Sequence, residues 1–172
     1  FQLNKTPVWR SLFGLAECDS RMRDMEFILR FFALSSEAFL RDTRERISLK
    51  QFLDIYMKSN SNPSQEILDT LCERFIKSIE IVHRTFGDSA FHSLSPSDPR
   101  KLVAKFSPTL FDSITLAADH AISVGGFRMP GNPEEARREL LQDEDYRLAV
   151  SLETMKSLFR DCCHQLGYHF LR

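Results

Sequence analysis

The chain has 172 residues and a mass of 20.0 kDa, which predicts one compact domain over residues 1–172. Its 42% hydrophobic and 27% charged residues exclude a disordered tail, and a formal net charge of −1 excludes strong non-specific attraction to nucleic acid or anionic membranes. Four scattered cysteines and the lack of an apolar run near the roughly 20 residues that span a bilayer predict a cytoplasmic protein without a membrane segment. The chain begins at Phe1 instead of methionine, which suggests a fragment of a larger protein.

Apolar residues recur at helical spacing along most of the chain, so we expect an all-α fold, an irregular bundle of about six to eight helices. The 15 phenylalanines predict a phenylalanine-rich core. The expected helices cover residues 7–13, about 19–34, 49–59, 64–86, 108–124, about 133–141 and about 151–166. Residues 88–106 contain several serine and proline steps and are interpreted as an irregular, partly anchored loop.

The most informative segment is Arg21–Leu34, RMRDMEFILRFFAL, which combines an amphipathic repeat with a dense set of charges. It resembles the R-x-x-D-x-E-x-x-L-R-F-x-A-L element in the helical half of GmrSD-like restriction proteins. The order of other motifs is similar too: W-x-x-L-F-G at Trp9–Gly14, S-L-K-Q-F-L-D-x-Y-M at Ser48–Met57, and L-F-D at Leu110–Asp112. The similarity covers about residues 1–122 and is weaker over the expected C-terminal helices, 132–172. Ser107 stands where we expect the family to have asparagine, which keeps a helix cap but not the amide.

The resemblance implies a role in bacterial phage defence. Members join such a helical half to a ParB/sulfiredoxin-like domain that hydrolyses nucleotides, and they are linked to nucleotide-dependent cleavage of modified or foreign DNA. The family's D-G-Q-Q-R catalytic loop and its HNH nuclease motif are missing from these residues. We therefore expect a scaffold and communication domain that packs against the catalytic half, in the same polypeptide or in a separate chain. The resemblance implies no catalytic residue, cofactor or metal of its own, and it leaves DNA contact and oligomerisation open.

Two interpretations stay open for the charges of this segment, which are Arg21, Arg23, Asp24, Glu26 and Arg30. Glu26 and Arg30 can pair on the helix surface, or the carboxylates can be buried against arginines of neighbouring helices as a structural bracket. Alternatively, the arginines face the catalytic half and contact a nucleotide phosphate or DNA. Physical reasoning alone favours the bracket.

A second basic group consists of Arg41, Arg44, Arg46 and Lys50, in a connection that leads into a helix start. Arginines near a helix N-terminus suit the DNA backbone, but Asp42 and Glu45 dilute the positive charge. We favour an ordinary solvated loop here and keep a DNA-backbone contact as the alternative.

Cysteine and histidine cluster near the C-terminus at Cys162, Cys163, His164 and His169. Adjacent cysteines on one helix point about 100° apart, and no second ligand pair is available, so the spacing argues against zinc. His83, His92 and His120 are interpreted as packing or surface residues. The main alternative for the whole chain is a free-standing helical interaction or regulatory module without any nucleotide or DNA role.

Overall fold

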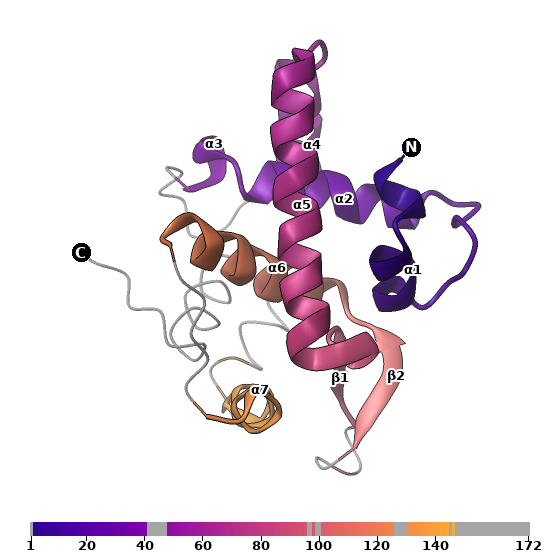
Figure 1. The fold of residues 1–172 in the computed structure, drawn as a ribbon, viewed down its shortest axis with the longest axis vertical. Coiled ribbons are helices and arrows are strands. Elements are labelled where there is room, and N and C mark those ends of the chain that lie inside the picture. The colour runs from indigo at the N-terminus through magenta and orange to yellow at the C-terminus, as the bar shows by residue number, and fades with distance from the viewer. Residues whose placement is uncertain are drawn as a thin grey trace.

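The computed structural model describes residues 2–40, 48–95, 98, 101–125, 131–144 and 146. The described α-helices are α1 (Pro7–Phe13), α2 (Arg23–Leu34), α3 (Glu37–Leu40), α4 (Leu49–Ser59), α5 (Gln65–Phe86), α6 (Pro108–Ser123) and α7 (Pro133–Gln142), with 3-10 turns at Leu3–Lys5 and Gly87–Ser89. Helix α5 runs along the longest axis of the molecule, and α2 and α6 cross it (Figure 1). Helix α6 packs against both α5 and α2, so these three helices form the centre of the fold.

The core is aromatic, as the composition predicts. Trp9 is fully buried, and its ring lies 5.6 Å from that of Phe75 and 5.5 Å from that of Phe111, measured between centroids. Phe27 completes the cluster at 5.3 Å from Phe111. These tilted and edge-on contacts are the geometries that aromatic rings prefer. They join α1, α2, α5 and α6, so one ring cluster holds the fold together.

The sequence signals for helix ends are confirmed in part: Thr6 and Ser48 stand at the N-cap positions of α1 and α4 but make no side-chain cap hydrogen bond. Ser64 and Ser107 accept hydrogen bonds from the backbone N–H groups of Ile67 and Leu110, as N-cap residues do. Gly14 ends α1 with φ of 77°, the left-handed conformation that favours glycine. The expected helix over 151–166 lies outside the described residues.

The prediction of an all-α fold is too simple. The fold is mostly helical, but β1 (His92–Leu94) and β2 (Leu102–Phe106) pair as antiparallel strands within the segment interpreted as an irregular loop. The physical reason lies in Phe106, whose ring packs 4.7 Å from Phe27 and 5.4 Å from Phe91. That packing fixes an extended backbone, although the pattern is too short to distinguish a strand from a loop by sequence.

The start of α2 was also predicted too early. The helix begins at Arg23, after Met22 in the left-handed conformation with φ of 57°, so Arg21 lies outside it. Asp19 accepts hydrogen bonds from the Arg21 N–H and the Arg23 Nε instead of capping a helix at residue 20. Among the described helices, none has the length and apolar character needed to cross a bilayer.

Candidate functional site

Asp24 is the centre of a buried polar cluster. Its side chain is fully buried and accepts four hydrogen bonds. Asn4 Nδ2 donates at 2.9 Å, Arg10 Nη1 at 3.0 Å and the Asp19 N–H at 2.8 Å, all to Oδ2, while the Met25 N–H donates to Oδ1 at 2.8 Å. The carboxylate therefore ties the first turn of α2 to α1 and to the N-terminal 3-10 turn.

Asn4 and Arg10 also bond each other and their surroundings, although Arg10 Nε is buried without a partner among the described residues. Asn4 Oδ1 accepts from Trp9 Nε1 at 3.1 Å and from Arg10 Nη2 at 2.5 Å, and Arg10 also donates to the Glu17 carbonyl at 3.0 Å. Burial by itself would raise the pKa of Asp24, but the hydrogen bonds from Asp19, Asn4 and Arg10 outweigh it and hold that pKa below its ordinary value. This carboxylate is held ionised, accepts four hydrogen bonds and is fully buried, so the cluster is architectural.

Two further carboxylates lie on one side of α6, each opposite an arginine of another helix. Arg30 of α2 makes a bidentate pair with Asp112, with Nε 3.1 Å from Oδ1 and Nη2 bonded to Oδ2. Arg74 of α5 pairs in the same way with Asp119, at 3.0 Å through Nε and 2.5 Å through Nη2. Residues 112 and 119 are about two helical turns apart, which places them on the same face. The two pairs fix α2 and α5 against α6.

The remaining charges of the signature segment lie at the surface. Glu26 is 56% exposed and its Oε1 lies 3.9 Å from Arg30 Nη1, which makes a weak surface pair. Arg21 is exposed, and Arg23, at 61% exposed, pairs with Asp19. The structure thus brings Asp24 and Arg30 into internal pairs and leaves Arg21 and Arg23 facing outward.

Of the second basic group, Lys50 lies exposed in the first turn of α4, whereas Arg41, Arg44 and Arg46 lie outside the described residues. The cysteines and histidines of residues 162–169 lie outside them as well. Within the described part, no group of three or more histidine, cysteine or acidic side chains is placed to hold a metal ion.

Sequence reasoning missed a Ser–Asp–His contact between α1 and the end of α5. Ser11 Oγ donates to Asp88 Oδ1, and His83 Nε2 lies 2.9 Å from the same oxygen. Hydrogen bonds from Ser11 and His83 lower the pKa of Asp88. In a catalytic triad the histidine lies between serine and aspartate and takes the serine proton. Here the carboxylate lies between them, so this group links two helices and is not a nucleophile.

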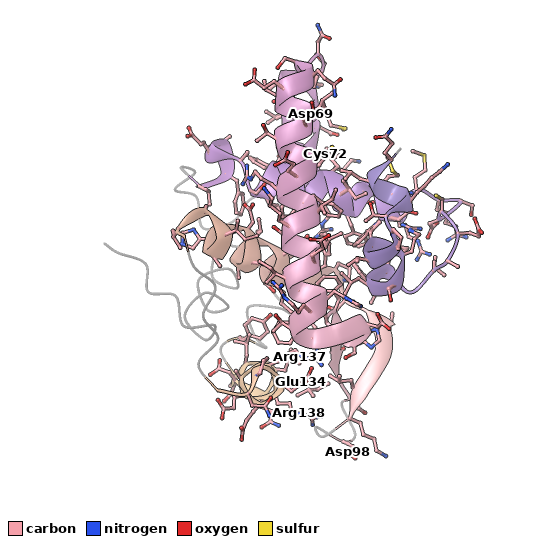
Figure 2. The ribbon with its side chains drawn as sticks, in the orientation of Figure 1. Asp69, Cys72, Asp98, Glu134, Arg137 and Arg138 are labelled. Atoms are coloured by element: carbon pink, nitrogen blue, oxygen red, sulfur yellow. The ribbon has the colours of Figure 1, made fainter. Side chains whose placement is uncertain are left out.

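Helix α7 contributes a buried arginine. Arg137 donates from Nη1 to the Ser89 carbonyl at 2.8 Å, and its Nη2 lies 3.3 Å from Glu134 Oε2. Its guanidinium lies 5.5 Å from the centroid of the Phe86 ring. Figure 2 shows Glu134 and Arg137 together on α7, below the lower end of α5. Burial lowers the pKa of Arg137. Arg137 thus joins α7 to the turn that follows α5.

A pocket of about 340 Å³ opens between α2, α3, α4 and α5. Its walls include Phe32, Phe52 and Leu71, and its polar groups include Tyr56 and Arg74. Apolar walls with a few polar groups are typical of small-molecule sites, and this volume lies near the small end of their range of about 300–1,000 Å³. The pocket is a candidate ligand site formed by the described residues.

The fold and these clusters define a mostly helical domain whose buried charges hold helices together. Comparisons with protein-family models, with curated proteins and with solved structures find no match to this chain. The family resemblance therefore stays a proposal.

Proposed function

We propose that this chain is the helical scaffold and communication domain of a GmrSD-like, nucleotide-dependent DNA restriction protein, acting with a ParB/sulfiredoxin-like catalytic half. The observation that carries the proposal is the use of the signature charges inside the fold. Asp24 and Arg30 supply the D and the second R of the motif, and each forms an ion pair with a residue of another helix. A motif used in this way supports a structural role for the helical half, and we propose that the chemistry belongs to the other half.

Exposed apolar side chains on α4 and α5 support contact with another protein. Met57 is 46% exposed on α4 and Leu68 is 40% exposed on α5, and Ile55 and Ile67, which line the pocket between these helices, are exposed as well. Large apolar side chains exposed to solvent are a feature of protein interfaces where they form a continuous patch. We propose this surface of α4 and α5 as the contact with the catalytic half.

The test is co-purification of the full chain with the catalytic half. Met57→Glu and Leu68→Glu place charges on the proposed contact and should reduce capture of the catalytic half without lowering the melting temperature. Val124→Glu is a matched control, because Val124 is 59% exposed and lies on neither α4 nor α5 but at the C-cap of α6. Equal capture by all three variants would exclude this surface.

The outward-facing arginines allow a phosphate contact as part of the same function. Arg21→Glu with Arg23→Glu should weaken nucleotide or DNA binding by the assembled protein, whereas unchanged binding would leave these residues as ordinary surface charges. For the second basic group, Arg44→Glu with Arg46→Glu should weaken DNA binding and flatten its dependence on salt. Unchanged affinity and salt dependence would remove that contact from the proposal.

The second candidate is a free-standing helical interaction or regulatory module, which the same exposed apolar side chains would also serve. The parent gene distinguishes the two. A D-G-Q-Q-R loop encoded in the same protein or beside it supports the restriction role, and an initiator codon just before Phe1 with no catalytic neighbour supports the module. Hydrolysis of nucleotide or DNA by these 172 residues alone, abolished by one substitution within them, would overturn both.

A further inference from the structure

Among the described residues that line the pocket between α2, α3, α4 and α5, the one charged side chain is a cation. Of the described residues that line it, Arg74 alone is ionised at neutral pH, and the rest are apolar or neutral polar. Asp119, the partner of Arg74, is not among the lining residues and bonds the Nε and Nη2 edge of the guanidinium. The pocket lining therefore includes one guanidinium and no acidic side chain, and Asp119 pairs with that guanidinium from outside the lining.

Two donors at the polar end of the pocket lack a partner. Within the described part of the chain, neither Arg74 Nη1 nor the Tyr56 hydroxyl makes a hydrogen bond. Asp119 holds the guanidinium plane in place, so Nη1 is positioned before any ligand arrives. A positioned pair of donors with an apolar wall favours a ligand that carries an acceptor, and anionic acceptors such as a carboxylate make the stronger, charge-assisted hydrogen bonds with a guanidinium.

We propose that this pocket binds a small carboxylic acid that carries one aromatic ring or one branched chain. The carboxylate accepts hydrogen bonds from Arg74 Nη1 and from the Tyr56 hydroxyl. The ring or chain packs against Phe32, Phe52 and Leu71, which come from α2, α4 and α5. This inference goes beyond the proposed function and does not depend on it.

The size and charge of the pocket decide against larger or more highly charged ligands. About 340 Å³ suits a single ring or a short branched chain. A nucleotide would bring several phosphate charges to a pocket whose described lining has one cation, already shared with Asp119. A neutral apolar molecule would leave the two donors unsatisfied, which costs free energy when they are covered.

The experiment uses two probes of nearly the same shape, phenylacetate and its neutral amide, phenylacetamide. Each is titrated into the isotope-labelled full chain and followed by NMR. We expect saturable shifts at α4 and α5 with phenylacetate, and binding of the amide about tenfold weaker, because hydrogen bonds to a charged group are the stronger kind. No saturable binding of phenylacetate, or equal binding of both probes, would overturn the proposal.

Two variants then locate the site. Tyr56→Phe removes only the hydroxyl and should weaken phenylacetate binding several-fold while leaving the helical circular dichroism unchanged. Ser59→Trp fills the pocket from an exposed position at the end of α4 and should abolish binding. Ser123→Trp is its matched control, because Ser123 is an exposed serine at the end of α6 and does not line the pocket.

Binding that survives both pocket variants would place the acid elsewhere and overturn the proposal. A different outcome identifies another occupant. If phenylacetate does not bind but Ser59→Trp weakens capture of the catalytic half while Ser123→Trp does not, the pocket holds a side chain of that protein, and the small-acid proposal fails while the proposed function gains support.

Discussion

Replacing Asp24 with asparagine tests whether the signature charges hold the fold together. The substitution keeps the shape of the side chain but removes the charge opposite Arg10, and it turns an NH₂ group toward N–H donors that now bond Asp24. Breaking a buried ion pair from one side costs about 3–5 kcal/mol, because the other charge is left unpaired. Native domains are stable by only about 5–15 kcal/mol, so the loss should be large in urea unfolding followed by circular dichroism.

The matched control for this change is Glu26→Gln. It makes the same acid-to-amide replacement on the same helix, but at a side chain that is 56% exposed and 3.9 Å from its arginine. We expect it to change the free energy of unfolding by no more than about 0.5 kcal/mol. A cost for Asp24→Asn that matches that of Glu26→Gln would refute the buried bracket.

The pH dependence of the unfolding free energy tests the same ion pair. The folded state holds the pKa of Asp24 below its ordinary value of 3.8, because the hydrogen bonds it accepts outweigh the effect of burial. Its contribution to stability is therefore complete above the unfolded pKa and is lost as the pH falls through the folded pKa. The gap in unfolding free energy between the natural chain and Asp24→Asn should begin to shrink below about pH 5 and keep shrinking as the pH falls past 3.8 toward the lowered folded pKa.

Three further predictions concern the charged pair on α6, the core and the thiols. Arg30→Lys keeps the charge but loses the bidentate pair with Asp112, so it should lower the free energy of unfolding in urea by about 2 kcal/mol; a negligible loss would mean that geometry is unimportant there. Trp9→Ala empties a fully buried site and should lower that free energy by about 3–5 kcal/mol, or prevent folding, as measured by calorimetry; a smaller loss would show that the ring cluster closes around the gap. Cys18 is exposed, whereas burial raises the pKa of the Cys72 thiol on α5 (Figure 2). Iodoacetamide labelling near pH 7.5, followed by peptide mapping, should therefore label Cys18 before Cys72. The reverse order would contradict the burial of Cys72.

Local signals in the sequence were enough to predict most helices. Ser64 and Ser107 precede helices that they cap, and Gly14 follows one that it ends, because capping depends on residues within one turn. The strands were missed because their pairing depends on distant packing around Phe106. The start of α2 was predicted too early because Asp19 takes part in a turn before the helix. Its N–H donates to the buried Asp24 and its carboxylate accepts from the Arg21 N–H, and the burial of Asp24 depends on the tertiary fold.

The structural bracket was predictable in kind but not in its partners. The dense charges of Arg21–Leu34 led us to favour a bracket, either a Glu26–Arg30 surface pair or carboxylates buried against arginines, yet nothing local identifies Arg10 or Asp112 as the partners that the structure shows. The acids of α6 are a sequence signal that points to such pairs. Asp112 and Asp119 interrupt an otherwise mostly apolar helix at a spacing that shares one face, and acids in such a place require cations from other helices.

A carbon-detected NMR titration of the Asp24 carboxyl would test most directly whether the signature charges are built into the fold. A bracketed carboxylate titrates below the ordinary value of 3.8, because four donors, one of them the buried Arg10 guanidinium, stabilise its charged form. A midpoint at or above that value would mean that Asp24 is buried without effective partners, and the interpretation of α2 as an internal bracket would be wrong.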